Sequence, residues 1–143
     1  FHQSIKLIFK HFTFENRKIN FISAYSGKEA EIIIKNNDDL AIIILDLVME
    51  NNDTGLELVK YIREIIKNLL VRIIFCTGKI EQAPEQSIFI NYDINYYQAK
   101  QEIIPAKFLT LIISALRGYM VLKVFCVKRV DLAKLNQILS NSK

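Results

Sequence analysis

The chain has 143 residues, of which 51% are hydrophobic and 24% are charged, and its formal net charge is +4. These values fit one compact globular domain and exclude a disordered or fibrous chain. Two cysteines are too few for a disulfide framework, and no unbroken apolar run reaches the roughly 20 residues of a membrane span, so we expect a cytoplasmic protein with no membrane segment.

Hydrophobic periodicity predicts an alternation of helices and strands along the chain. Ser26 and Glu29 have the spacing of a capping box, which predicts a helix start, and Pro84 interrupts any helix in the loop over 79–90. A helix–strand alternation of this kind is typical of a mostly parallel, doubly wound α/β sheet. The predicted elements are helix 1–12, strand 18–26, a helix from residue 26, strand 40–46, a helix after residue 54, strand 71–78, a short strand in 94–100 and helix 105–119.

Residues 40–46 contain a lone acid at the end of an apolar run, because Ala41 to Leu45 are followed directly by Asp46. A short run rich in β-branched residues predicts a strand buried on both faces, as in parallel sheets. A carboxylate at the carboxyl end of such a strand lies in the crevice where open α/β sheets bind ligands. Asp46 is therefore the first candidate for a functional residue.

Thr77 and Lys100 end the next two predicted strands in the same way. The carboxyl ends of parallel strands share one edge of the sheet, so we expect these side chains to converge with Asp46. A carboxylate can accept a phosphoryl group, an ammonium can neutralise its charge, and a hydroxyl can donate to a phosphoryl oxygen. The three residues predict phosphoryl transfer.

The motifs "IIILDLVM", "IIFCTG" and "YYQAK", at these spacings, resemble the receiver (CheY-like) domain of two-component response regulators over about residues 1–119. The resemblance implies a flavodoxin-like fold, with Asp46 as phosphoacceptor, Thr77 as switch hydroxyl, Tyr97 as switch aromatic and Lys100 as the site lysine. It also implies that Mg²⁺ binds Asp46 and the backbone carbonyl of Val48. The loop details are most similar to receivers that precede a sensor-like middle domain and a cyclic-di-GMP phosphodiesterase output.

The sequence departs from the receiver pattern at several points. It opens in the first helix, so the preceding central strand and its Mg²⁺-binding acidic pair are not in the sequence, and we expect Mg²⁺ to bind weakly or not at all. Phe1 is not a usual translation start, so we expect the sequence to begin inside a longer chain. Glu50 and Gln101 stand where receivers usually have proline, and the loop over 79–90 leaves room for only a reduced fourth helix.

The resemblance implies a signalling domain and not an enzyme. Its expected partners are a histidine kinase or phosphotransfer protein, an output domain of the same chain and a second copy of the chain. The alternative is a phosphorylation-independent interaction module with a receiver fold. A nucleic-acid binder would need basic residues on one exposed face together with aromatic or polar readers, and the sequence favours no direct nucleic-acid contact.

Residues 120–143 form a C-terminal extension, and the chain is basic from Arg117 onward, where six basic residues are accompanied by one acid, Asp131. We expect this extension to continue the last helix, although residues 120–130 also have strand-like composition. Such a strand could fill the place of the missing first strand beside 40–46, whereas we expect residues upstream of Phe1 to fill it. A helix would carry a stripe suited to a dimeric coiled coil. The stripe comprises Leu109, Ile113, Leu116, Met120, Val124 and Val127.

Overall fold

The computed structural model of the chain describes residues 1–46, 54–78 and 86–141. Its centre is a parallel sheet of three strands in the order β3 (Ile42–Asp46), β4 (Arg72–Thr77) and β5 (Tyr96–Ala99). The register places Asp46 opposite Cys76 and Thr77 opposite Ala99. The carboxyl ends of the three strands therefore meet at one edge, as the sequence predicts.

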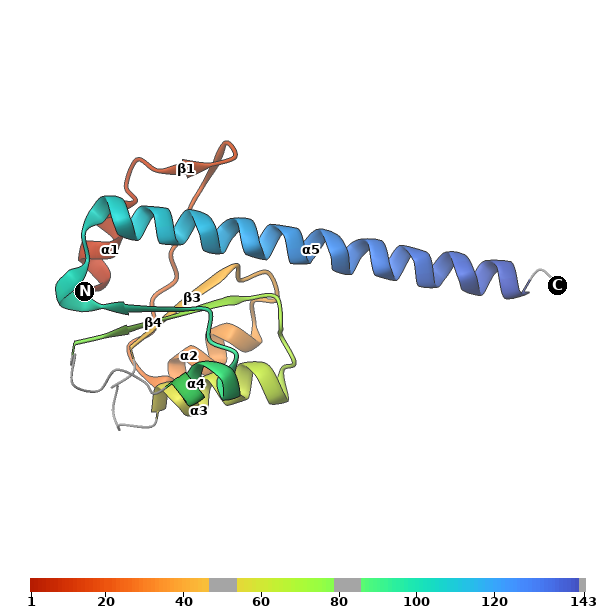
Figure 1. The fold of residues 1–143 in the computed structure, drawn as a ribbon, viewed down its shortest axis with the longest axis horizontal. Coiled ribbons are helices and arrows are strands. Elements are labelled where there is room, and N and C mark those ends of the chain that lie inside the picture. Colours follow the sequence, from red (N-terminus) through yellow and green to blue (C-terminus); the bar gives the residue numbers. More distant parts are fainter. Residues whose placement is uncertain (47–53, 79–85, 142–143) are drawn as a thin grey trace.

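Helices cover both faces of this sheet (Figure 1). The helices are α1 (His2–Ile8), α2 (Gly27–Lys35), α3 (Thr54–Lys60), α4 (Gln86–Tyr92) and α5 (Pro105–Asn141). One face packs against α2, α3 and α4, and the other packs against α1 and α5. Alternate residues of β4 enter the two cores, since Ile73 and Phe75 face one and Ile74 and Cys76 face the other, all without exposed surface. Burial of β4 on both faces explains its unbroken apolar sequence.

The predicted helix start at Ser26 is confirmed by local detail. Ser26 caps α2, because its hydroxyl accepts a hydrogen bond from the backbone N–H of Glu29 at 3.1 Å, and the Glu29 carboxylate accepts one from the N–H of Tyr25 at 2.8 Å. After Pro84 the structure describes a fourth helix, α4, over Gln86–Tyr92, while residues 79–85 lie outside the described ranges, so the reduction of this helix stays a prediction.

A buried arginine ties the amino-terminal ends of β4 and β5 together. After α3 the chain makes a π-helical turn, Tyr61–Ile65, and the guanidinium of Arg63 within it donates to the carbonyls of Asn68, Val71 and Asp93 at 2.6 to 3.3 Å. Arg63 is 9% exposed, and this burial lowers its pKa although the Asp93 carboxylate, 3.1 Å away, acts in the opposite direction. The hydrogen bonds satisfy carbonyls of the two loops that enter β4 and β5.

The strand predicted at 18–26 is wrong. Residues 19–24 form no strand, and the segment before them is instead a hairpin of β1 (Thr13–Phe14) and β2 (Arg17–Lys18). A strand forms only where a neighbouring strand can accept and donate its backbone hydrogen bonds. In the part of the chain that the structure describes, β3 has β4 as its single neighbour. That residues upstream of Phe1 supply the missing neighbour stays a prediction.

The last helix continues far beyond the sheet, as expected for the C-terminal extension. α5 has 37 residues, is buried against the sheet at Phe108, Ile112, Ala115 and Tyr119, and then projects from the body (Figure 1). Residues 120–130 are thus helical and do not enter the sheet. By length and composition alone α5 could cross a membrane, with a mean hydropathy of 1.7 over 18 residues. The division into a receiver-like domain, 1–119, and an extension, 120–143, stays a prediction.

Candidate functional site

Asp46 and Lys100 form an ion pair at the carboxyl edge of the sheet. The Lys100 ammonium donates to Oδ2 of Asp46, from a 3₁₀ turn (Lys100–Glu102) that directly follows β5. The Lys100 side chain is 25% exposed and the Asp46 side chain is 32% exposed, so solvent still reaches the pair. β3 and β5 are separated by β4, and the lysine side chain is long enough to bridge the end of the middle strand.

Thr77 ends β4 between these two residues. It has no exposed surface, and the next residue, Gly78, lies beneath the lysine stem, since a Cβ added there would be 4.0 Å from Lys100 Cδ. The side-chain amide of Gln101 donates to the carbonyl of Gly78. The glutamine that replaces the usual proline of receivers therefore fastens the end of β4 to the turn after β5.

Tyr97 lies on β5, three residues before Lys100, and is half-buried on the face covered by α4. Its ring meets that of Phe89 edge to face, with the centroids 6.3 Å apart. Burial raises the pKa of the Tyr97 hydroxyl, with a further contribution from the Glu102 carboxylate. The ring of Tyr97 packs against the core. Its place on β5, near the carboxyl edge of the sheet, is the one that the resemblance to receivers implies for the switch aromatic.

Cys76 lies beside the site without taking part in its chemistry. Its thiol has no exposed surface, and burial raises its pKa to about 12, assisted by the Asp46 carboxylate and opposed by the Lys100 ammonium. A thiol with that pKa stays protonated at neutral pH and is a poor nucleophile. Cys76 is thus a core residue, as a small side chain inside a buried strand predicts.

One contact at the site has no signal in the sequence. The Lys100 Nζ lies 4.8 Å from the centroid of the Phe1 ring, within the range of a cation–π interaction. Phe1 precedes α1, and no spacing rule connects it to a residue 99 positions later. The interaction follows from the packing of α1 on the sheet.

The residues described at this edge do not make up a complete Mg²⁺ site. In the described ranges no three His, Cys, Asp or Glu side chains gather where they could hold a metal ion. Asp46 is the carboxylate supplied by the strand ends, and an ammonium already bonds one of its oxygens. Mg²⁺ needs oxygen ligands in octahedral geometry, most often with more than one carboxylate or a phosphate. Val48, expected to contribute a carbonyl, lies outside the described residues.

The arrangement supplies a nucleophilic oxygen and two groups that can stabilise added charge. The Asp46 side chain is 32% exposed, Thr77 ends the neighbouring strand β4, and Lys100 reaches the carboxylate from the end of β5. Such a set can hold an anionic group bonded to Asp46 by ion pairing and hydrogen bonding. Three of the residues predicted from the sequence, Asp46, Thr77 and Lys100, are brought to one edge.

Comparison with known proteins finds a bacterial relative of the chain. It is 41% identical over 118 residues to "3'3'-cGAMP-specific phosphodiesterase 2" of Vibrio cholerae serotype O1; the match covers 82% of this chain and 23% of the relative. The chain thus spans about a quarter of the length of that relative. No family model matches the chain.

Solved structures of receiver domains share the fold. The N-terminal domain of a response regulator/sensory box/GGDEF protein from Carboxydothermus hydrogenoformans matches with a TM-score of 0.64 and 18% identity, over 84% of this chain and 88% of that one. A signal receiver domain from Clostridium thermocellum matches with a TM-score of 0.63 and 19% identity, over 80% and 87% of the two chains. The chain has the flavodoxin-like fold of response regulator receiver (CheY-like) domains.

Proposed function

We propose that this chain is a phosphoacceptor domain of two-component signalling, phosphorylated on Asp46 by a histidine kinase or a phosphotransfer protein. The observation that supports this function is the ion pair between Asp46 and Lys100 at the carboxyl ends of β3 and β5, with Thr77 at the end of the strand between them. A partly exposed ion pair contributes little to stability. A lysine that crosses the end of the middle strand to reach this carboxylate is, however, well placed to neutralise a phosphoryl group bonded to it.

In the proposed reaction a carboxylate oxygen of Asp46 forms a bond to phosphorus while the bond between phosphorus and the imidazole nitrogen of the donor breaks. Lys100 would shift from the carboxylate to a phosphoryl oxygen, where it offsets part of the added charge. The Thr77 hydroxyl would donate to another phosphoryl oxygen. A movement of Thr77 would open space near the half-buried ring of Tyr97. A shift of that ring would change its packing on Phe89 of α4, and so the surface that α4 and β5 present.

The proposed output is carried by a longer chain of which these residues are the regulatory part. The relative named as a 3'3'-cGAMP-specific phosphodiesterase is about four times as long as the matched region, which covers 23% of it. The proposal assigns the cyclic-dinucleotide phosphodiesterase activity to the remainder of such a chain and a regulatory role to this domain, with α5 as the connection. The protein would work in the cytoplasm, where its kinase and a cyclic dinucleotide would both be present.

The proposed phosphorylation is tested in the full-length protein with radiolabelled acetyl phosphate or a phosphorylated donor kinase. We expect Asp46→Asn to abolish labelling, because the amide cannot form an acyl phosphate. Asp39→Asn replaces an acid that lies just before the start of β3, at the opposite end of the strand from Asp46; it is the matched control and should label like the wild type. Labelling of Asp46→Asn at the wild-type level would contradict the proposal.

A second candidate, a phosphorylation-independent interaction module, is favoured by one observation. The described residues at the site provide one carboxylate, already paired with Lys100, and no set of metal ligands. In that case acetyl phosphate would not label the full-length protein at all, whereas binding to partner proteins would be unchanged by Asp46→Asn. The labelling experiment therefore separates the two functions.

A further inference from the structure

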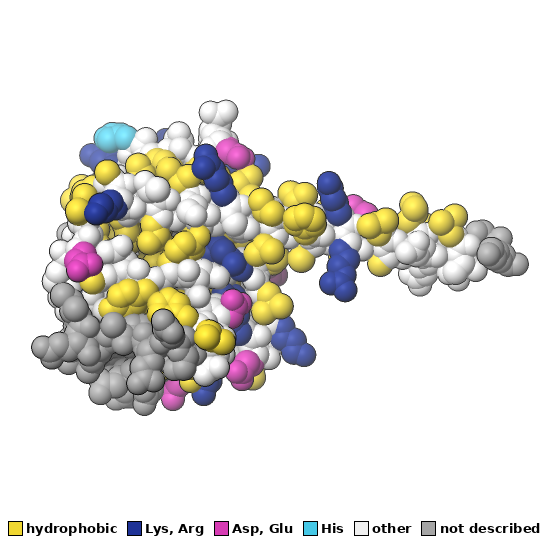
Figure 2. Space-filling view, in the orientation of Figure 1, with side chains coloured by type: hydrophobic (Ala, Val, Ile, Leu, Met, Phe, Trp, Pro, Cys, Tyr) yellow, Lys and Arg dark blue, Asp and Glu magenta, His cyan; other side chains and the backbone are white. Residues whose placement is uncertain are grey.

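The part of α5 that projects from the body carries large apolar side chains in contact with solvent. Beyond Tyr119, the last residue of α5 buried against the sheet, most apolar side chains are more than half exposed (Figure 2). A helix with this much exposed apolar surface is unstable alone in water and needs a covering partner. The exposed set is Met120, Val121, Val124, Phe125, Val127, Val130, Leu132, Leu135, Ile138 and Leu139.

Most of this set lies on one side of the helix. Residues three or four positions apart lie on the same side of a helix. One such row runs through Met120, Val124, Val127, Leu135 and Ile138, and a second row runs beside it. The second row comprises Val121, Phe125, Leu132, Leu135 and Leu139. The charged residues within the two rows are Lys128 and Asp131. We call these two rows together the apolar face of α5.

The apolar face has a symmetric pattern about the midpoint between residues 129 and 130. Lys128 and Asp131 lie at equal distances from that midpoint, on opposite sides of it. Moving outward from the midpoint, most apolar residues of the face on one side are matched by an apolar residue on the other, whereas Phe125 is matched by the stem of Lys134. The matched pairs are Val127 with Leu132, Val124 with Leu135, Val121 with Ile138 and Met120 with Leu139.

We propose that a second copy of this chain covers the apolar face by packing its own α5 antiparallel, with a two-fold axis between residues 129 and 130. In that arrangement Lys128 meets Asp131 of the partner subunit, and Asp131 meets the partner's Lys128, so both buried charges are paired. A parallel, in-register pair would place Lys128 beside the partner's Lys128 and would leave like charges inside an apolar interface. The dimer does not depend on phosphorylation of Asp46.

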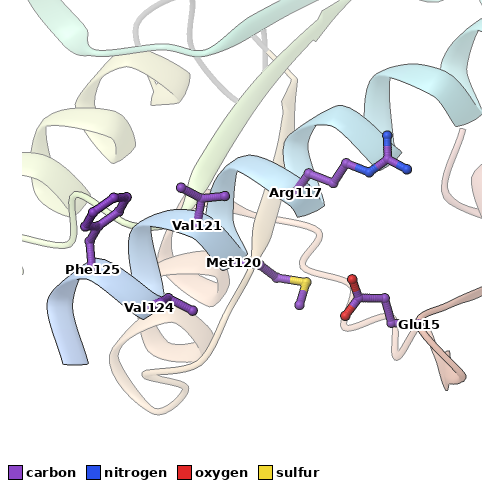
Figure 3. A pocket seen from close by; sticks show the side chains of 6 residues that line it. All are labelled: Glu15, Arg117, Met120, Val121, Val124 and Phe125. Atoms are coloured by element: carbon purple, nitrogen blue, oxygen red, sulfur yellow. The ribbon is translucent and has the colours of Figure 1, made fainter. Parts of the chain in front are cut away.

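A hollow at the base of the projecting segment fits the end of the partner helix. Its volume is about 400 Å³, and Figure 3 shows that the side chains of α5 line it together with one residue of the hairpin turn. The antiparallel register brings Ile138 and Leu139 of the partner subunit to Met120 and Val121, which lie in this wall. The lining residues are Glu15, Arg117, Met120, Val121, Val124 and Phe125.

A membrane is a less suitable cover for the same surface. The apolar window of α5 that could cross a bilayer overlaps the part of the helix that is packed on the sheet through Phe108, Ile112 and Ala115. Insertion would remove those side chains from the core. The projecting segment also carries charges in close succession, which are costly in hydrocarbon. They are Lys123, Lys128, Arg129, Asp131 and Lys134.

The oligomeric state of the 143-residue chain is the first test, measured by sedimentation equilibrium. We expect a dimer, and we expect Leu135→Glu to raise the dissociation constant roughly tenfold or more, because it places a charge in the apolar interface. Ala133→Glu adds the same charge on the opposite side of the helix and should leave the dimer intact. A wild-type monomer that binds phosphatidylcholine–phosphatidylglycerol vesicles, or that stays monomeric without them, would overturn the proposal.

The direction of the two helices is the second test, with Cys126→Ala as the background. Chains carrying Val124→Cys and chains carrying Leu135→Cys should form a disulfide with each other when mixed and oxidised, and neither should do so alone. Lys128→Asp should weaken the dimer, and adding Asp131→Lys should restore it. Efficient cross-linking of the Val124→Cys chain to itself would show a parallel pair and refute the antiparallel arrangement.

Discussion

Cys76 lies directly opposite Asp46 in the parallel pairing of β3 and β4, so a fully buried thiol is the neighbour of a half-buried carboxylate. Burial raises the pKa of Cys76 to about 12, against an ordinary value of 9.0; the Lys100 ammonium opposes this change, and the Asp46 carboxylate adds to it. The relationship has a measurable effect on stability at high pH.

We expect the free energy of unfolding to fall as the pH rises from about 9 towards 12. In this window the unfolded chain releases the Cys76 proton while the folded chain retains it, which favours unfolding by up to about 1.4 kcal/mol per pH unit. The measurement is urea denaturation at pH 8, 9 and 10 for the wild type and for Cys76→Ala. The variant should be less stable at pH 8 but should lose less stability at pH 10. Equal losses in both chains would show that the thiol ionises as readily in the folded state.

The close approach of α2 and α3 at Gly27 predicts a strong effect of one methyl group. A Cβ added to Gly27 would lie 2.6 Å from Cγ2 of Thr54, which is closer than carbon atoms can pack. We expect Gly27→Ala to destabilise the fold by about 1–3 kcal/mol, measured by thermal or urea denaturation. Thr54→Ser removes the opposing methyl group and should recover much of the loss. Additive effects of the two substitutions would contradict this explanation.

Gly118, in the middle of α5, is the matched case in which a methyl group fits. The nearest atom to an added Cβ is Cδ of Arg72 at 3.6 Å, an ordinary contact. Because alanine favours helices over glycine, Gly118→Ala should stabilise the protein by about 0.5–1 kcal/mol. A measured loss of stability at this position would mean that the helix is less regular here than the structure indicates.

Removing the guanidinium of Arg63 should destabilise the protein by about 2–4 kcal/mol, since buried carbonyls of the loops before β4 and β5 would lose their donors. Arg63→Met, compared with wild type by urea denaturation, measures this effect. Arg63→Lys keeps the charge but offers fewer donors and should recover only part of it. Lys107→Met, at an exposed position of α5, is the control and should be nearly neutral. A neutral Arg63→Met would show that solvent satisfies those carbonyls.

We expect Mg²⁺ to bind the 143-residue chain weakly or not at all, because the described residues hold no cluster of metal ligands. Isothermal titration calorimetry on protein treated with a chelator provides the measurement, and Asp46→Asn should behave like the wild type. Micromolar affinity that disappears in Asp46→Asn would show that the site is more complete than the described side chains suggest.

The strands that bury both faces could be predicted from the sequence, whereas the outcome over 18–26 could not, because the described residues offer this segment no neighbouring strand. β3 and β4 fall inside 40–46 and 71–78, because their long apolar runs have no alternative to burial. The alternating pattern over 18–26 also predicts a strand, yet alternation indicates only a preference for one buried face and does not supply hydrogen-bond partners. The hairpin before it was missed although Asn16, which tolerates a positive φ, stands in its turn.

For the candidate site, the residues at the strand ends could be predicted from the sequence, whereas the contacts made by packing could not. Asp46, Thr77 and Lys100 were found because each ends a recognisable strand, and parallel topology brings such ends together. The Phe1 ring near Lys100 and the amide of Gln101 on the Gly78 carbonyl depend on how a helix and a turn settle on the sheet. Local sequence does not encode contacts of that kind.

Because α5 is long, a small change in its direction at the sheet produces a large displacement at its far end. It begins at Pro105, five positions after Lys100, and its 37 residues extend over about 55 Å. The segment beyond Tyr119 accounts for about 33 Å of that length. A tilt of about 5° at the base would move the far end sideways by about 3 Å, on the order of a side-chain contact distance. A rearrangement around Lys100 that is too small to disturb the core could thus change which side chains meet at the distal end.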